Sequence, residues 1–404
     1  MDGWRRNLYV IWLATFASLA GANMAMPFLP LFIQRDLGIS DPGDAAIWSG
    51  LANAASGISM AVMAPIWGSI ADRHGRKAML VRAQFAMGLA NASSAFVGAP
   101  WQLVGIRSVQ GMFSGVVGAS RALVASTVPR ERVAHSMGLI QSAIFLGQTL
   151  GPTIGGVVGS LLGFRATLVG TGIVNGIAGI LAVLYIREQV IPKERKPVSF
   201  RAGIAEIVRS RPLAILIGLQ VLATISNASI RPIVPLFLAT LDTTLDAAMT
   251  AGFGFAALGI AGAVASVGIG RGAATVGLRR LVPLAALGAA SFTAGMAWVA
   301  SPTTALLALF GIGFFQGAVA SAAAALLSLY APANRQATAF GVATSAQALA
   351  MGGGPLLGGV VASSFDLQAP FLMAGVGLLA AVALSLTLGP IPGFETPPVP
   401  SEAT

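Results

Sequence analysis

Twelve stretches of mostly apolar residues, each long enough to cross a lipid bilayer as a helix, follow one another along this chain of 404 residues. A membrane-spanning helix needs about 20 such residues. Hydrophobic residues make up 55% of the chain and charged residues only 9%, whereas a soluble domain carries about 25% charged residues. So few charges cannot cover a water-soluble globule, and the sequence predicts an all-α membrane protein. The expected spans are residues 8–34, 46–70, 78–98, 102–124, 136–160, 166–186, 213–240, 250–270, 281–300, 303–328, 338–363 and 369–390.

The basic residues are unevenly divided between the two sides of the predicted helix bundle. Twenty of the 24 lysines and arginines fall on the side of the N-terminus, while the loops of the other side contain only Arg35 and Arg165. Cytoplasmic loops carry such an excess of Lys and Arg. The asymmetry predicts that both termini are cytoplasmic. It also accounts for the net charge of +10 without nucleic acid as a partner.

The two halves of the chain repeat each other. Residues 151–158 read GPTIGGVV and residues 354–361 read GPLLGGVV, and PFLPLF at 27–32 matches PIVPLF at 232–237. Parallel repeats of this kind are typical of transporters that bind substrate between the halves, near the bilayer midplane. The expected organisation is an N-terminal six-helix half (1–186), a cytoplasmic linker with a helix on the membrane surface (187–212), a C-terminal six-helix half (213–390) and a cytoplasmic tail (391–404).

The loop between the second and third spans reads GSIADRHGRKAML, residues 68–80. Its glycines permit a close helix approach and a turn, and the carboxylate of Asp72 can stabilise a positive helix end. The corresponding loop of the second half has Ala274 in place of the aspartate, so we expect a charge switch in the first half only. The expected gating residues of the loop are Gly68, Asp72, Arg73, Gly75, Arg76 and Lys77.

Two further motifs lie in the fourth and fifth spans. The fourth contains Arg107, Gln110 and Gly111, and the fifth contains glycines spaced four residues apart around a proline. Such glycines form a flat helix face for close packing, and the proline bends the helix. General tight packing is the alternative to a specific gating role. The gating residues expected in the fifth span are Gly147, Gly151, Pro152, Gly155 and Gly156.

Together these motifs resemble those of the major facilitator superfamily. The loop at 68–80 is similar to its GxxxDRxGRK signature, residues 107–111 to its RxxQG motif, and residues 147–156 to the GxxxGPxxGG motif of exporters in the drug:proton antiporter branch. The resemblance covers essentially the whole chain. It implies a twelve-helix exporter of amphiphilic drugs or small organic anions that works by alternating access and is coupled to protons.

The chain departs from that branch in its acidic residues. The resemblance implies a proton-carrying carboxylate inside a span, but no aspartate, glutamate or histidine falls inside a predicted span. Asp72 on the inner side and Asp36 or Asp44 on the outer side are the remaining candidates. Alternatively, a weakly acidic substrate carries the proton itself.

Two arginines, Arg107 and Arg231, lie inside spans at similar depth, one in each half. An uncompensated cation in a membrane costs about 3 kcal/mol or more unless it faces protein or water. We therefore expect a positively charged cavity that prefers anionic or zwitterionic amphiphiles and holds an anion between the two arginines. The alternative is that each arginine binds free backbone carbonyls. The resemblance implies that spans 1, 4, 7 and 10 line the cavity, where the expected substrate-binding residues are Asn23, Arg107, Gln110, Asn227, Arg231 and Gln316.

Other functions are less compatible with the sequence. A lipid or metabolite transporter of the same fold, including an importer, remains the alternative. A membrane enzyme is disfavoured because the spans contain no acid pair and no nucleophile–base pair, and the absence of cysteine disfavours a structural zinc site. We expect a monomer in the bacterial plasma (inner) membrane, in contact with lipid, with a small-molecule substrate and protons as partners and with no metal or cofactor.

Overall fold

The computed structural model describes residues 3–129, 133–188, 209–241, 246–331 and 336–389, and its elements in these ranges are helices. The first half contains α1 (Gly3–Ala25), the 3-10 helix η1 (Met26–Phe28), α2 (Leu29–Leu37), α3 (Pro42–His74), α4 (Arg76–Ser94), α5 (Pro100–Phe113), α6 (Val116–Thr127), α7 (Val133–Leu162) and α8 (Phe164–Tyr185). The second half contains α10 (Arg211–Ile230), α11 (Ile233–Thr240), α12 (Ala247–Val276), α13 (Leu278–Gly295), η3 (Met296–Trp298), α14 (Pro302–Tyr330), α15 (Gln336–Ser364) and α16 (Ala369–Leu386).

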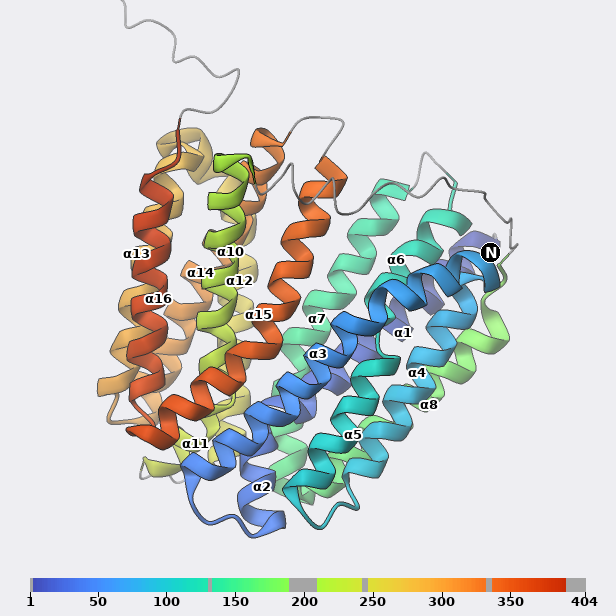
Figure 1. The fold of residues 1–404 in the computed structure, drawn as a ribbon, viewed down its shortest axis with the longest axis horizontal. Helices are drawn as coiled ribbons and strands as arrows, with labels where there is room; N and C mark the ends of the chain where they lie inside the picture. Colours follow the sequence, from blue (N-terminus) through green and yellow to red (C-terminus); the bar gives the residue numbers. More distant parts are fainter. Residues whose placement is uncertain (1–2, 130–132, 189–208, 242–245, 332–335, 390–404) are drawn as a thin grey trace, which may run out of the picture.

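These helices form twelve segments in the order expected from the sequence (Figure 1). Within the described residues, nine segments are by themselves long and apolar enough to cross a membrane. The other three depart for local reasons. Helix α4 carries Arg76, Lys77 and Arg82, the fourth segment is divided into helices of 14 and 12 residues, and α15 is rich in glycine. Most of the expected linker and the tail at 391–404 lie outside the described residues.

The two halves are built alike, which confirms the repeat. In the first half α1 packs against α7 and α8, and α4 packs against α8; in the second half α10 packs against α15 and α16, and α13 packs against α16. The turns match as well. Gly75 begins α4 with a φ of 92° and Gly277 begins α13 with a φ of 84°, a backbone conformation that only glycine adopts freely.

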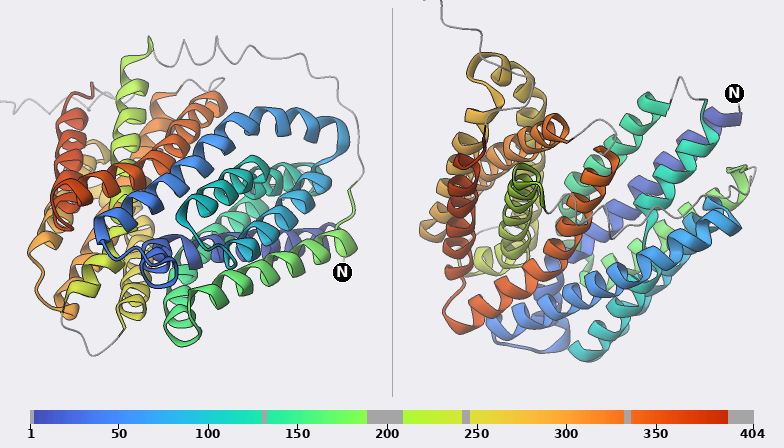
Figure 2. Two further views of the ribbon diagram at one scale, coloured as in Figure 1. Left: turned by 60° about the horizontal axis from the view of Figure 1, so that its bottom comes forward. Right: turned by 45° about the horizontal axis from the view of Figure 1, so that its top comes forward.

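The halves meet at one end of the bundle and diverge toward the other (Figures 1 and 2). We call the end with α2 and α11 the closed end. The largest buried apolar cluster lies there and contains side chains of both halves, for example Phe28 and Phe255, whose rings are 6.4 Å apart. At the other end, the open end, each half has a separate cluster of its own. Consistent with this divergence, Ile58 and Val62 in the middle of α3 are 61% and 64% exposed.

The first and seventh segments are interrupted at equivalent positions near the closed end. The first changes into a 3-10 helix at Met26–Phe28, and the seventh is interrupted at Arg231 and Pro232. Proline causes both interruptions, because its nitrogen cannot donate a helical hydrogen bond and its ring clashes with the preceding turn. Aligning the repeats at Pro27 and Pro232 places Met26 opposite Arg231.

The fourth segment, expected to be continuous over 102–124, is broken between α5 and α6. Ser114 is extended and Gly115 has a φ of 126°. The carbonyls freed by the break accept hydrogen bonds from two other helices: Trp67 donates to Met112 at 2.6 Å, and Arg82 donates to Ser114 at 3.1 Å. The Arg82 guanidinium also stacks on the Trp67 ring at 3.6 Å. Side chains distant in sequence therefore stabilise the interruption.

Candidate functional site

The glycines of α7 fit this helix against α1. A Cβ atom at Gly147 would lie 2.7 Å from the Leu19 side chain, and one at Gly151 would lie 2.6 Å from the Ala20 carbonyl oxygen. At Gly155 it would overlap the carbonyl oxygen of Met24. Cβ atoms do not approach backbone oxygen so closely, so no larger residue fits without moving the helices apart.

The next glycine faces the other half of the molecule. A Cβ at Gly156 would overlap the carbonyl oxygen of Ala248 in α12, across the closed end. The equivalent pair in α15 behaves in the same way. A Cβ at Gly358 would overlap the carbonyl oxygen of Ser229 in its own half, and a Cβ at Gly359 would lie 2.5 Å from the carbonyl oxygen of Ala46 in the first half. In each pair, the first glycine permits close packing within its own half, and the second permits contact with the other half. Pro152 lies in the same stretch, inside α7.

The expected gating loop is ordered by a carboxylate that no sequence motif identified. The Glu188 carboxylate accepts hydrogen bonds from the backbone N–H groups of Arg76 at 3.0 Å and Lys77 at 2.7 Å, at the start of α4. An anion is favourable at a helix N-terminus. The side chains of Arg76 and Lys77 donate to the carbonyls of Ala122 and Val183. The end of α8 is therefore joined to the loop.

Three other expected residues of this loop, Gly68, Asp72 and Arg73, belong to the last turns of α3. The surroundings of Gly68 and the side chains of Asp72 and Arg73 lie outside the described part of the structure.

Asn23 and Arg231 connect the two halves. Arg231 Nη1 donates to Asn23 Oδ1 at 3.4 Å, and Asn23 Nδ2 donates to the Leu19 carbonyl at 2.8 Å. Both residues adjoin the interruptions of their segments, on the closed side of the bundle. The Nε atom of Arg231 is buried without a hydrogen-bond partner among the described residues. The contact thus brings together two of the six expected substrate-binding residues.

Arg107 belongs to a separate network inside the first half. It is 4% exposed, its Nη1 donates to Gln110 Oε1 at 2.9 Å, and Gln110 Nε2 donates to Asn91 Oδ1 of α4 at 3.4 Å. Arg107 Nε and Nη2 and Asn91 Nδ2 are buried without a partner among the described residues. The network has more donors than acceptors, which a ligand with acceptor oxygens would complement.

The remaining two expected substrate-binding residues also form a pair. Asn227 Nδ2 of α10 donates to Gln316 Oε1 of α14. The six residues therefore form three contacts, Asn23–Arg231, Arg107–Gln110 and Asn227–Gln316, of which only the first joins the halves. In this conformation Arg107 and Arg231 belong to different networks.

Two ion pairs lie at the surface of the closed end. Arg35 Nη1 contacts Asp246 Oδ2 at 3.0 Å and joins the two halves, whereas Arg165 Nε contacts Asp36 Oδ1 at 3.1 Å within the first half. Arg165 also donates to the carbonyls of Ala95 and Val97. Exposed ion pairs contribute about 0–1 kcal/mol each, so they order the closed end more than they stabilise it.

The sequence model described as Major Facilitator Superfamily matches residues 11–352 and 219–404 of this chain. The chain belongs to this superfamily. It is an integral multi-pass membrane protein and a transporter rather than an enzyme, and its substrates are small molecules.

Its relatives within the superfamily include drug exporters. It is 32% identical over 370 residues to a multi-drug resistance efflux pump PmrA homolog of Lactococcus lactis, an alignment that covers 91% of this chain and 90% of the relative. It is 29% identical to the multidrug resistance protein MdtG of Salmonella heidelberg, over 94% of each chain. Among solved structures, the nucleoside transporter NupG has a TM-score of 0.78 and 13% identity, covering 94% of this chain and 99% of that one, a likeness of fold alone.

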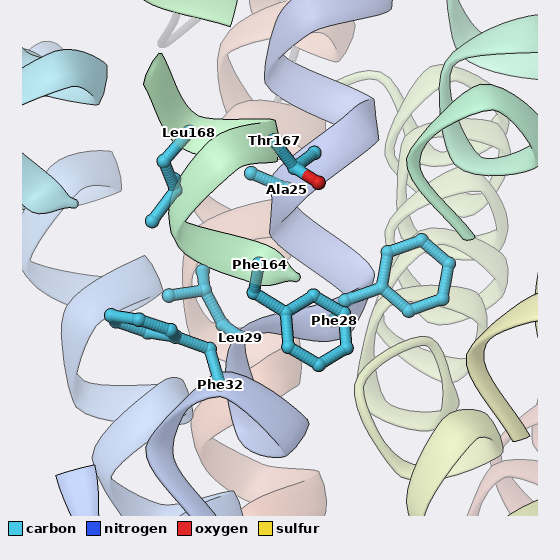
Figure 3. Close-up of a pocket in the computed structure, with 7 residues that line it drawn as sticks. All are labelled: Ala25, Phe28, Leu29, Phe32, Phe164, Thr167 and Leu168. Carbon is cyan, nitrogen blue, oxygen red and sulfur yellow. The ribbon is translucent and has the colours of Figure 1, made fainter. Parts of the chain in front are cut away.

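An apolar pocket lies beside the interruption of the first segment, away from the polar networks described above (Figure 3). The Phe28 and Phe164 rings stack there, 6.2 Å apart. The hydroxyl of Thr167, the polar lining side chain, donates to the Gly163 carbonyl at 3.2 Å. The pocket is lined by Ala25, Phe28, Leu29, Phe32, Phe164, Thr167 and Leu168. None of the six expected substrate-binding residues lines it.

Two residues of these networks were not identified from the sequence. Glu188 lies at the end of α8, 112 positions from its partner Arg76, and Asn91 lies 19 positions from Gln110. Glu188 directly follows a span and precedes the basic linker, a position that gives no motif. Asn91 is a polar residue inside a span, the one sequence signal available for it.

Proposed function

We propose that this transporter exports amphiphilic drugs or small organic anions across the bacterial plasma (inner) membrane by alternating access, coupled to protons. The observation that carries the proposal is the 32% identity, over 91% of the chain, to a multidrug efflux pump. The two-half architecture, joined at one end and divergent at the other, provides the two-state element that alternating access needs.

The closed end is assigned to the outer side of the membrane. The open end carries the start of α1 with Arg5 and Arg6, and the start of α4 with Arg76 and Lys77, whereas the closed end carries Arg35 and Arg165. Under the positive-inside rule the basic end is cytoplasmic. The conformation then receives substrate from the cytoplasm, and both termini are cytoplasmic. A monomer surrounded by lipid is sufficient for this cycle.

The substrate-binding residues of this proposal are Asn23, Arg107, Gln110, Asn227, Arg231 and Gln316. Two buried guanidinium groups and surplus amide donors favour anionic or zwitterionic amphiphiles over cations. An anion that binds between the halves would hold the Arg107 and Arg231 networks together in one conformation. In the other conformation the two networks would lie apart. The proton carrier is Asp72, Asp36 or Asp44, or the weakly acidic substrate itself.

The test is transport by the purified protein in proteoliposomes, with and without a pH gradient. Toluenesulfonate and phenyltrimethylammonium are suitable labelled probes, because these aromatic ions have similar sizes and permanent, opposite charges. We expect counterflow of the anion in preference to the cation. Because toluenesulfonate stays ionised, its accumulation in a pH gradient would assign the proton to a carboxylate of the protein rather than to the substrate. Export of neither probe class, with uptake of a metabolite in the opposite direction, would favour the alternative of an importer or a lipid or metabolite transporter.

A further inference from the structure

Four polar residues form one face of α10. Gln220, Thr224, Asn227 and Arg231 follow one another at intervals of four, three and four residues, the spacing of a single helical face. At 1.5 Å per residue the face extends for about 16 Å along the helix. It begins in the middle of the segment and ends at the interruption beside the closed end. The face therefore extends along the axis that joins the open end to the closed end.

The polar face of α10 contacts three different helices. Gln347 Nε2 of α15 donates to Gln220 Oε1 at 2.8 Å, Asn227 donates to Gln316 of α14, and Arg231 donates to Asn23 of α1. Figure 1 shows α10 beside α14 and α15. The face thus points into the space between these helices and the first half, rather than toward lipid.

This face has a surplus of hydrogen-bond donors. In each amide pair, one N–H group donates to the oxygen of the partner, and the other N–H groups of the pair remain available to donate. Among the described residues, Gln220 Nε2, Gln316 Nε2 and Arg231 Nε are buried and have no acceptor. The four residues include no carboxylate. A molecule that complements them must therefore supply acceptor oxygens.

A polar cluster in the first half shows the arrangement that holds helices together. Gln84 and Asn175 are 0% exposed, Gln84 Nε2 donates to the Ala14 carbonyl at 2.7 Å, and Gln84 Oε1 accepts from Ser18. The Ser18 hydroxyl also lies 2.9 Å from Asn175 Oδ1, and Asn175 Nδ2 donates to the Thr171 carbonyl. Neither amide leaves a buried atom without a partner among the described residues. Gln220, by contrast, is only partly buried and has an unused donor.

We propose that Gln220 and Gln347 form an additional substrate contact, nearer the open end than Asn227 and Arg231, that selects ligands bearing carboxylate, sulfonate or similar oxyanion groups. The inference rests on the proposed export function and assigns a specificity role to two residues outside the six named there. The amide pair opens as the substrate oxygens replace Gln220 Oε1 and accept from the freed N–H groups. Asn227 and Arg231 on the same face, with Gln316 of α14 beside Asn227, then provide the next acceptor-binding positions.

The informative substitution is Gln220→Glu. A carboxylate at this position still accepts the hydrogen bond from Gln347 Nε2, so the helix contact is retained, but the unused N–H group is replaced by a negative charge. Gln84→Leu is the control. It removes an amide of the cluster in the first half, where no buried amide atom lacks a partner among the described residues and the role of the amide is structural. The readouts are counterflow of toluenesulfonate and of phenyltrimethylammonium, and the thermal unfolding midpoint of the purified protein.

For Gln220→Glu we expect the anion-to-cation ratio of initial rates to fall by about ten-fold or more, the value of one hydrogen bond to a charged group, with an unchanged unfolding midpoint. Gln84→Leu should lower the midpoint and reduce both rates together. An unchanged ratio in Gln220→Glu would overturn this inference alone, provided that the wild type transports the anion. A wild type that transports only the cation would overturn both this inference and the proposed anion preference.

Discussion

Helices α7 and α15 carry the same glycine motif in the two halves and use it in the same way. Gly155 and Gly358 pack against the first and seventh segments, and Gly156 and Gly359 approach the opposite half. The polar positions of the halves differ. Arg231 aligns with Met26, and the loop with Asp72 has Ala274 in its counterpart. The repeat therefore conserves the packing, while the charged residues Arg231 and Asp72 each occur in one half only.

The largest effect is expected where the halves are alike. Gly155→Leu and Gly358→Leu should each prevent recovery of folded protein, because the side chain would overlap the carbonyl of Met24 or Ser229. Overpacking costs about 1–3 kcal/mol, and more where backbone must move. Gly170→Leu in α8 is the control, since a Cβ there meets nothing within 4 Å. The measurement is the yield of monodisperse protein; equal tolerance of all three variants would disprove the packing role.

The next effect concerns the loop that differs between the halves. Asp72→Asn should abolish most transport while the protein inserts normally, because we expect the charge of Asp72 to stabilise one conformation through a helix end. Ala274→Asp, which copies the charge into the second half, should not restore transport to the Asp72→Asn variant. Transport rates at matched protein levels provide the measurement. Normal transport by Asp72→Asn would show that the asymmetry of the loops is unimportant.

Arg231→Met makes the second half resemble the first at the interruption. Transport of anionic substrates should fall while transport of cations is spared, because the guanidinium that contacts Asn23 is lost. Arg231→Lys should retain part of the anion transport, since it keeps the charge and loses the planar fork. A resistance profile over anionic, neutral and cationic compounds is the measurement. A proportional loss of all three classes would make Arg231 a structural residue.

The smallest effect is expected at Glu188. Glu188→Gln removes the negative charge at the start of α4 and should destabilise the protein by about 0.3–1 kcal/mol. Asp366→Asn is the matched control: Asp366 Oδ1 accepts from the N–H groups of Gln368 and Ala369 at 2.9 and 2.7 Å, and the side-chain oxygen of asparagine can accept the same two bonds. Thermal unfolding distinguishes the two. Identical midpoints would mean that the Glu188 contact adds no stability.

The sequence predicts those features that depend on local pattern. The order of the helical segments, the repeat and the turns at Gly75 and Gly277 follow from hydropathy and glycine spacing, and the structure confirms them. The break at Ser114 and Gly115 could not be predicted, because Trp67 and Arg82 from two other helices satisfy its carbonyls. Pairing of side chains likewise requires the tertiary fold.

The six expected substrate-binding residues illustrate this limit. Their residue types identified them, since polar side chains are costly inside a membrane. Their partners could not be inferred in the same way. Asn91 contacts Gln110, and Arg231 contacts Asn23 at a separation of 208 positions. The sequence indicated which polar residues lie inside the spans, but the assignment of Arg107 and Arg231 to separate networks required coordinates.

Alternating access requires the halves to separate at the closed end, and cross-linking at the two ion pairs there tests whether they do so. The chain has no cysteine, so paired cysteines can replace Arg35 and Asp246, which join the halves, or Asp36 and Arg165, which join elements of one half. A short flexible thiol-reactive cross-linker should abolish transport by the Arg35→Cys/Asp246→Cys variant and leave transport by the Asp36→Cys/Arg165→Cys variant intact. Undiminished transport by fully cross-linked Arg35→Cys/Asp246→Cys protein would contradict this requirement.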